Sequence, residues 1–217
     1  LTGLGLKLSG ILVDLSQGNL LVLLVLTMIA SIILGMGLPT TACYIILAIL
    51  SAPALVKVGV LPIGAHLFVF YFGIISAITP PVAGAAFAAA PIAGTGPMGI
   101  AFTACRLGIA AFILPYMWIY GPALLLIGEP LTVIFVVITS TIGIAACAMG
   151  IQGYLFRPIS TLERGMLLVA SLLLIKPGWI TDIIGLGLLI PVLINQGLLG
   201  KIAGLMKKPQ PLGSMGG

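Results

Sequence analysis

The chain has 217 residues, of which 61% are hydrophobic and 6% are charged, whereas a soluble globular domain carries about 25% charged residues. This composition excludes a soluble domain and predicts a chain embedded in lipid. The net charge of +5 comes from basic residues scattered singly or in pairs between apolar segments, which is typical of residues that set membrane topology and does not indicate nucleic-acid binding.

The apolar runs predict an all-α, polytopic helical membrane protein. Runs such as 20–33 and 131–143 are apolar on every side, whereas the strands of a β-barrel alternate apolar and polar residues over about 10 positions. A spanning helix needs about 20 apolar residues, so the chain has room for about six or seven passes or half-passes. Because it opens at Leu1 without a leader, we expect it to be part of a longer protein.

The first two segments predict a surface helix and a hairpin. Residues 1–19 place apolar residues at helical spacing, which predicts an amphipathic interfacial helix or the end of a preceding span. Residues 20–56 form two apolar legs separated by a Gly-Met-Gly-Leu-Pro-Thr-Thr break at Gly35–Thr41. Each leg is about 22 Å long, shorter than a hydrocarbon core of about 30 Å. We therefore expect a re-entrant hairpin.

Residues 63–94 predict a second interrupted, or discontinuous, helix, with its break at Ser76–Pro81. Pro80 and Pro81 lack backbone donors and suit the first turn of a new helix, so the break is expected near residues 77–79. The second half is rich in Ala and Gly, which favours close packing between helices in lipid.

Further membrane helices are predicted up to residue 200. Residues 98–128 complete the unit that begins at residue 20, with a helix at Ile100–Leu114 that carries Arg106. Residues 129–200 are interpreted as C-terminal membrane helices, which begin with a clean span at Leu131–Met149.

A polar stretch with Arg157 and Arg164 follows that span and is expected on the cytoplasmic side. The apolar residues 166–194, interrupted at Lys176–Gly178, form either two short legs or one broken span. Residues 201–217 predict a basic flexible tail.

The scarcity of acidic residues limits the chemistry that is available. The four carboxylates lie at the edges of apolar segments: Asp14, Glu129, Glu163 and Asp182. A proton relay through intramembrane acids is therefore not expected. A cation site would instead use backbone carbonyls and hydroxyls, as broken helices do when they bind Na⁺. The candidate ion-binding residues at the two breaks are Gly35, Gly37, Thr40, Ser76 and Thr79.

For several of these features, a purely structural interpretation stays open. Each break could be a plain kink whose Thr hydroxyl bonds to the preceding turn. Arg106 could snorkel to the surface or meet an anionic substrate, and the candidate substrate contacts are Thr41, Pro80 and Arg106. His66 is the single histidine, which excludes a His-rich metal cluster and an HExxH motif. The three cysteines are interpreted as inert thiols. No catalytic residues are predicted, so an intramembrane hydrolase is disfavoured.

Three motifs in a fixed order resemble the large permease subunit (DctM-like) of TRAP transporters over residues 1–128. They lie at Gly35–Ala42, His66–Gly73 and Ile78–Ala83. The extension beyond residue 128 is similar to the C-terminal end of the fused 4TM/12TM permeases of the TAXI branch.

This resemblance implies a Na⁺-coupled symporter in a bacterial or archaeal inner membrane that takes up organic acids such as carboxylates. A periplasmic substrate-binding protein of the TAXI type would deliver the substrate, and an elevator motion would carry it across. Residues 20–128 would be half of the transport domain, with the two breaks forming one Na⁺ half-site. The N-terminal remainder, including the small-subunit-like part, would be a further partner. The alternative is a channel or a structural subunit of another membrane complex.

Overall fold

The computed structural model describes residues 3–197, and these residues form helices with no strand beyond one isolated bridge between Tyr154 and Pro158. The elements are α1 Leu4–Ser16, α2 Leu20–Gly35, α3 Thr40–Leu50, α4 Ala52–Lys57, α5 Pro62–Ile75, α6 Gly84–Ala93, α7 Pro97–Leu107, α8 Ile109–Tyr120, η1 Pro122–Leu125, α9 Pro130–Gln152, α10 Thr161–Ile175 and α11 Trp179–Asn195. The all-helical prediction is confirmed. The tail predicted at 201–217 lies outside the described residues.

Within residues 3–197, two helices are long and apolar enough to cross a membrane. They are the continuous run Thr40–Lys57 (α3 with α4), with a mean hydropathy of 1.7, and α9, with a mean hydropathy of 2.3. The chain bends by 115° between α6 and α7, and this bent pair is apolar enough to be one broken span or a re-entrant loop. The prediction of a polytopic helical membrane protein is confirmed by these helices together with the shorter apolar ones.

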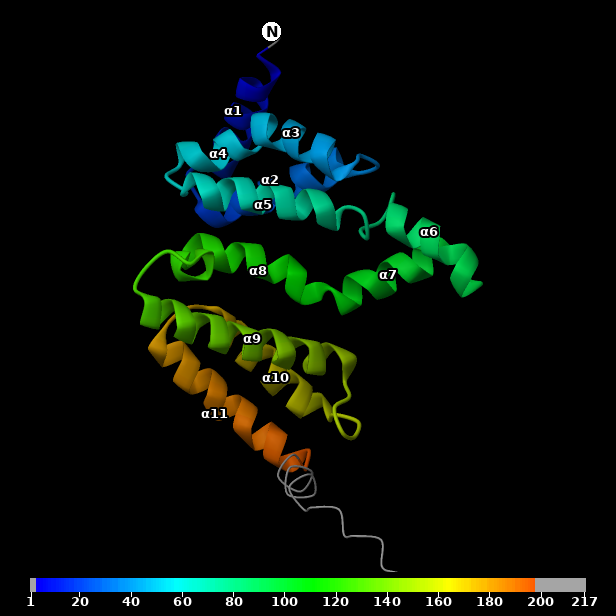
Figure 1. Cartoon of the computed structure of the whole chain (residues 1–217), viewed down its shortest axis with the longest axis vertical. Coiled ribbons are helices and arrows are strands. Elements are labelled where there is room, and N and C mark those ends of the chain that lie inside the picture. The colour runs from blue at the N-terminus through cyan, green and yellow to red at the C-terminus, as the bar shows by residue number, and fades with distance from the viewer. Residues whose placement is uncertain (1–2, 198–217) are drawn as a thin grey trace, which may run out of the picture.

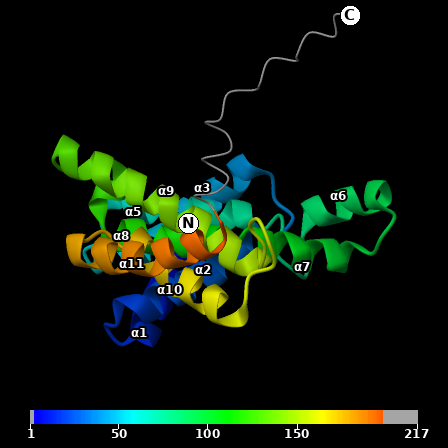
Figure 2. The same ribbon diagram turned by 90° about the horizontal axis from the view of Figure 1, so that it is seen from below.

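The helices stack along the long axis of the molecule (Figure 1). The first five helices lie at one end, α7 and α8 cross the middle, and α9 to α11 form the other end. A view along the long axis shows α6 and α7 projecting together to one side (Figure 2). The helix α5 contacts α2, α3, α4 and α8, so it is the centre of the N-terminal unit.

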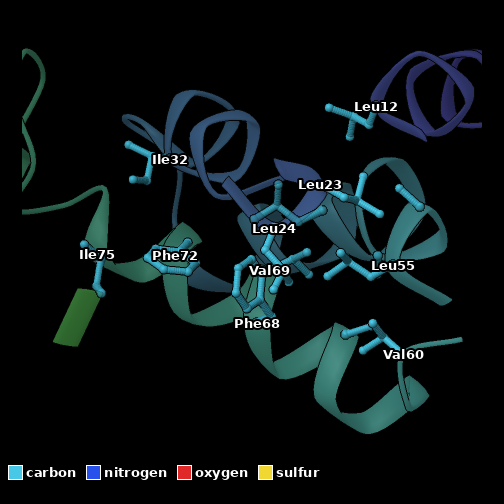
Figure 3. Packing of buried hydrophobic residues seen from close by; sticks show 14 of the residues in the cluster. Leu12, Leu23, Leu24, Ile32, Leu55, Val60, Phe68, Val69, Phe72 and Ile75 are labelled. Atoms are coloured by element: carbon cyan, nitrogen blue, oxygen red, sulfur yellow. The ribbon is translucent and has the colours of Figure 1, made fainter. Parts of the chain in front are cut away.

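The core of the N-terminal unit consists of large side chains that are fully buried between α2, α4 and α5 (Figure 3). This cluster includes Leu23 and Leu24 of α2 together with Phe68 and Phe72 of α5. Phe68 also makes an edge contact with Tyr116 of α8, with the ring centroids 5.4 Å apart. The aromatic residues of α5 therefore hold α8 against the N-terminal unit.

The second break differs from the sequence prediction. The helix α5 ends at Ile75 and α6 begins at Gly84, so Pro80 and Pro81 lie inside the break and not in the first turn of the next helix. The reason is that Ala83 has a φ of 38°, a left-handed conformation through which an α-helix cannot continue. The helix predicted at Ile100–Leu114 is likewise divided, because α7 ends before Gly108 and α8 begins after it.

The C-terminal helices α10 and α11 form a hairpin in which α10 packs on α9. The amide of Asn195, at the end of α11, donates to Glu163, at the start of α10, over 2.5 Å, and Arg157 donates to the carbonyl of Asn195. The two outer ends of α10 and α11 therefore lie together, and Lys176–Gly178 is the turn at the opposite end. Of the two alternatives for residues 166–194, the structure shows two short antiparallel legs.

Candidate functional site

The two helix breaks meet because α2 and α5 cross in direct contact at glycine residues. A Cβ atom on Gly35 would lie 2.7 Å from the carbonyl oxygen of Gly73 and 2.9 Å from the hydroxyl of Ser76. A Cβ atom on Gly73 would lie 2.6 Å from the sulfur of Cys43. Only residues without a side chain permit this approach, which is typical of helix packing in membranes.

A cavity of about 380 Å³ lies at this crossing and is lined by both breaks. Its lining residues are Gly35, Gly37, Leu38, Pro39, Thr40, Cys43, Gly73, Ile74, Ser76, Ala77, Gly84 and Ala85. Four of the five predicted ion-binding residues are therefore brought together, although they come from segments more than 35 positions apart in the sequence. Thr79 does not line the cavity.

Four helix ends converge on this cavity. The C-terminal ends of α2 and α5 contribute Gly35 and Ser76, and the N-terminal ends of α3 and α6 contribute Thr40 and Gly84. Carbonyl groups at a helix C-terminus carry partial negative charge and attract cations, whereas the N–H groups at an N-terminus favour anions. No lining residue is acidic or basic. The cavity thus offers both signs of partial charge without an ionised side chain.

The hydroxyl groups at the second break are engaged with the preceding helical turn. The hydroxyl of Ser76, which is buried, donates to the carbonyl oxygen of Gly73 over 2.5 Å. The hydroxyl of Thr79 donates to the carbonyl oxygen of Ile75 over 2.8 Å. These bonds match the plain-kink interpretation, and they also leave the oxygen lone pairs free to accept a hydrogen bond or a cation.

The predicted substrate contacts lie apart from the cavity lining. Thr41 is exposed beside Thr40 in the first turn of α3, and Pro80 is half-buried in the second break. Arg106 is exposed in the last turn of α7, where its guanidinium donates to the carbonyl of Ile151 over 3.2 Å. None of these three residues lines the cavity.

Several lining residues were not predicted as site residues. Cys43 and Gly73 lie about one helical turn from a predicted residue, and Ala77 directly follows Ser76. The small size of these residues was the available signal. His66 does not line this cavity, and its Nδ1 atom pairs with the hydroxyl of Tyr44 over 3.2 Å. The three cysteines are free thiols, and the described residues contain no group of His, Cys, Asp and Glu able to hold a metal ion.

A larger cavity, of about 700 Å³, lies at the turn of the α10–α11 hairpin. Its walls include Thr139, Trp179 and Asp182. One carboxylate oxygen of Asp182, Oδ1, is buried without a hydrogen-bond partner. In the sequence, Asp182 lies at the edge of an apolar segment. In the structure, the hairpin brings it beside Thr139 of α9. Thr139 lies nine residues, or about 13 Å, from the first residue of that helix, Pro130, so Asp182 is beside the middle of α9 and not beside its end.

Two families match the chain. The family described as tripartite ATP-independent periplasmic transporter, DctM component, matches residues 1–133. A domain of unknown function, DUF3394, matches residues 133–185. No curated protein and no solved structure shows a significant match to the chain. The cavity between the two breaks lies within the first match, and most of the cavity at the hairpin turn is lined by residues of the second.

Proposed function

Since this chain belongs to the DctM family, the large permease component of TRAP transporters, we propose that it couples the entry of Na⁺ to the import of small organic acids. The family is a family of transporters and not of enzymes, and its members work with a substrate-binding protein and a small membrane subunit. The coupling ion would occupy the cavity between the two helix breaks.

One observation carries this proposal: two breaks that are distant in sequence share one cavity that contains no ionised side chain. Proton relays within membranes use carboxylates or imidazoles, and neither lines this cavity. Na⁺ is bound in other secondary transporters by unwound carbonyls and helix C-terminal ends, while helix N-termini face the carboxylate of the substrate. The ends of α2 and α5 on one side, and of α3 and α6 on the other, supply both kinds of group.

We further propose that a periplasmic binding protein of the TAXI type delivers the substrate and that the small subunit is fused to the permease. The support is the DUF3394 segment directly after the DctM segment, an order that resembles the fused permeases. The proposed location is the inner membrane of a bacterium or archaeon.

Uptake by the complete permease in vesicles, with its cognate binding protein, tests this function. We expect saturable uptake of an organic acid that stops when Na⁺ is replaced by K⁺ and continues when the pH gradient is collapsed. Ser76→Ala should raise the Na⁺ concentration needed for half-maximal uptake. Its matched control is Ser171→Ala, because the Ser171 hydroxyl is also buried and also donates to a carbonyl three residues earlier, over 2.7 Å. Uptake that is unchanged in K⁺ would exclude Na⁺ coupling.

The alternative function is a channel or a structural subunit, in which the breaks serve only helix packing. The contacts of Gly35 and Gly73 would be present in either case. Flux that does not saturate, or that does not require a binding protein, would favour this alternative.

A further inference from the structure

Two arginines from different helices converge on one backbone oxygen at the end of α9. The Nη2 atom of Arg106, in α7, lies 3.2 Å from the carbonyl oxygen of Ile151. The Nη2 atom of Arg164, in α10, lies 3.2 Å from the same oxygen, and its Nε atom lies 3.0 Å from the carbonyl oxygen of Gly150. The two Nη2 atoms are therefore no farther apart than twice 3.2 Å.

None of the carboxylates in the described part of the chain pairs with these two arginines. Glu163 precedes Arg164 in the sequence, but its carboxylate accepts hydrogen bonds from Ser160 and Asn195. A third arginine at this end, Arg157, donates to the carbonyl of Asn195. The partial negative charge at the C-terminus of α9 offsets only part of the converging positive charge. Part of this positive charge therefore has no counter-charge among the described residues.

The two guanidinium groups retain most of their donors. A guanidinium has five N–H donors, of which Arg106 uses one and Arg164 uses two in the bonds described above. Arg106 is exposed and Arg164 is half-buried, so a ligand can approach from outside. Planar guanidinium groups match the oxygens of a phosphate in bidentate hydrogen bonds of about 2.7–2.9 Å. Two of them at this spacing suit one phosphate group.

The pair lies at the depth of lipid headgroups. The 23 residues of α9 span about 34 Å, slightly more than a hydrocarbon core of about 30 Å. Ile151, one residue before the end of α9, is therefore at the membrane surface, next to the exposed Tyr154, as is usual for interfacial aromatic residues. The concentration of arginines assigns this end to the cytoplasmic leaflet, where anionic lipids attract basic residues.

An apolar recess lies along α7, the helix that carries Arg106. The position of the pair at the membrane surface, and not this recess, favours a lipid headgroup over a free anion. The recess has a volume of about 430 Å³, and its lining residues are Thr95, Gly99, Ile100, Thr103, Ala104 and Leu107. Arg106 lies on the same helix between two of these residues.

We propose that Arg106 and Arg164 bind the phosphate group of an anionic phospholipid. Arg106 lies in the segment that matches the DctM family, and Arg164 lies in the segment that matches DUF3394. The lipid thus joins the permease segment to the C-terminal hairpin, which gives the DUF3394 segment the role of a lipid-dependent support. This proposal does not rest on Na⁺ coupling, and its test measures lipid binding and stability without transport.

The test uses the complete permease, purified in detergent and supplied with phosphatidylglycerol or phosphatidylethanolamine. Native mass spectrometry measures the lipid that stays bound, and thermal unfolding measures stabilisation. We expect the permease to retain phosphatidylglycerol preferentially. Arg106→Gln should reduce this retention about tenfold, the value of one charge-assisted hydrogen bond, and Arg164→Gln should reduce it at least as much. Arg157→Gln is the matched control, since it removes an equal charge at the same end of α9, and should leave retention within about twofold.

Three results would overturn the proposal. They are equal retention of both lipids by the unaltered permease, an equal loss in Arg157→Gln and Arg106→Gln, and stabilisation by inorganic phosphate as strong as that by phosphatidylglycerol. If Arg164→Gln fails to fold, Arg164→Lys keeps the charge without the planar fork and should still lower retention. Arg106 is exposed and makes one hydrogen bond, so Arg106→Gln is expected to fold.

Discussion

Gly35→Ala tests whether the two helix breaks are held together by the close crossing of α2 and α5. The added Cβ atom would lie 2.7 Å from the Gly73 carbonyl oxygen, 2.9 Å from the Ser76 hydroxyl and 3.0 Å from the Cys43 sulfur. The first of these contacts is with backbone, which cannot rotate away. The helices must therefore separate, and the cavity between the breaks must change shape.

The expected cost follows from two opposing effects. Overpacking a tight contact costs about 1–3 kcal/mol, whereas replacing a helical glycine by alanine returns roughly 0.5–1 kcal/mol. Gly35→Ala should therefore lower the unfolding temperature of the purified permease and weaken its Na⁺ dependence. Gly187→Ala is the matched control, because Gly187 is helical and a Cβ atom there meets nothing within 4 Å, so this variant should be slightly stabilised. A Gly35→Ala protein with unchanged stability and unchanged Na⁺ dependence would refute the reasoning.

Three other variants test the C-terminal hairpin. Hydrogen bonds, chiefly from the Ser160 backbone N–H, hold the pKa of Glu163 below its usual range. The ionised carboxylate therefore stabilises the folded protein. This stabilisation is complete above about pH 4.3, the pKa of an unperturbed Glu, and is lost as the pH falls through the lowered pKa. Thermal unfolding over a pH series should show a smaller acid loss in Glu163→Gln than in the unaltered protein. Gly121→Ala would overlap the ring of Pro177 and should cost about 1–3 kcal/mol of unfolding free energy, measured by denaturation. Asp182→Asn removes a charge from a carboxylate with an unpartnered buried oxygen, so it should raise the unfolding temperature; a decrease would show that the charge is compensated.

The positions of the breaks could be predicted because short residue patterns at the breaks themselves interrupt the helices. A Gly-x-Gly-x-Pro segment and two consecutive prolines interrupt helices wherever they occur. The start of α6 could not be predicted in the same way, because it depends on the left-handed conformation of Ala83, which nothing in the adjacent residue types requires. The convergence of the breaks depends on the crossing of Gly35 with Gly73, a contact between residues that no local pattern connects.

The surroundings of two charged residues, Asp182 and Arg106, could not be predicted from their positions in the sequence. Asp182 lies at the edge of an apolar segment in the sequence. Because α11 folds back antiparallel to α10, Asp182 lies beside Thr139 of α9 in the structure. The sequence also left open whether Arg106 snorkels or meets a substrate. In the structure its guanidinium reaches the carbonyl of Ile151, 45 residues away, and such a contact depends on how α7 packs against α9. The position of a charged residue at the edge of an apolar segment therefore does not predict how deeply its side chain lies among the helices when those helices are short and fold back on one another.

Binding of radiolabelled sodium to the purified complete permease tests the central claim most directly, because it requires neither substrate nor binding protein. The account predicts saturable sodium binding that Ser76→Ala weakens and that Ser171→Ala leaves unchanged, since only Ser76 lines the cavity between the two breaks. Equal sodium binding by the unaltered permease and Ser76→Ala, or equal weakening in both serine variants, would contradict it.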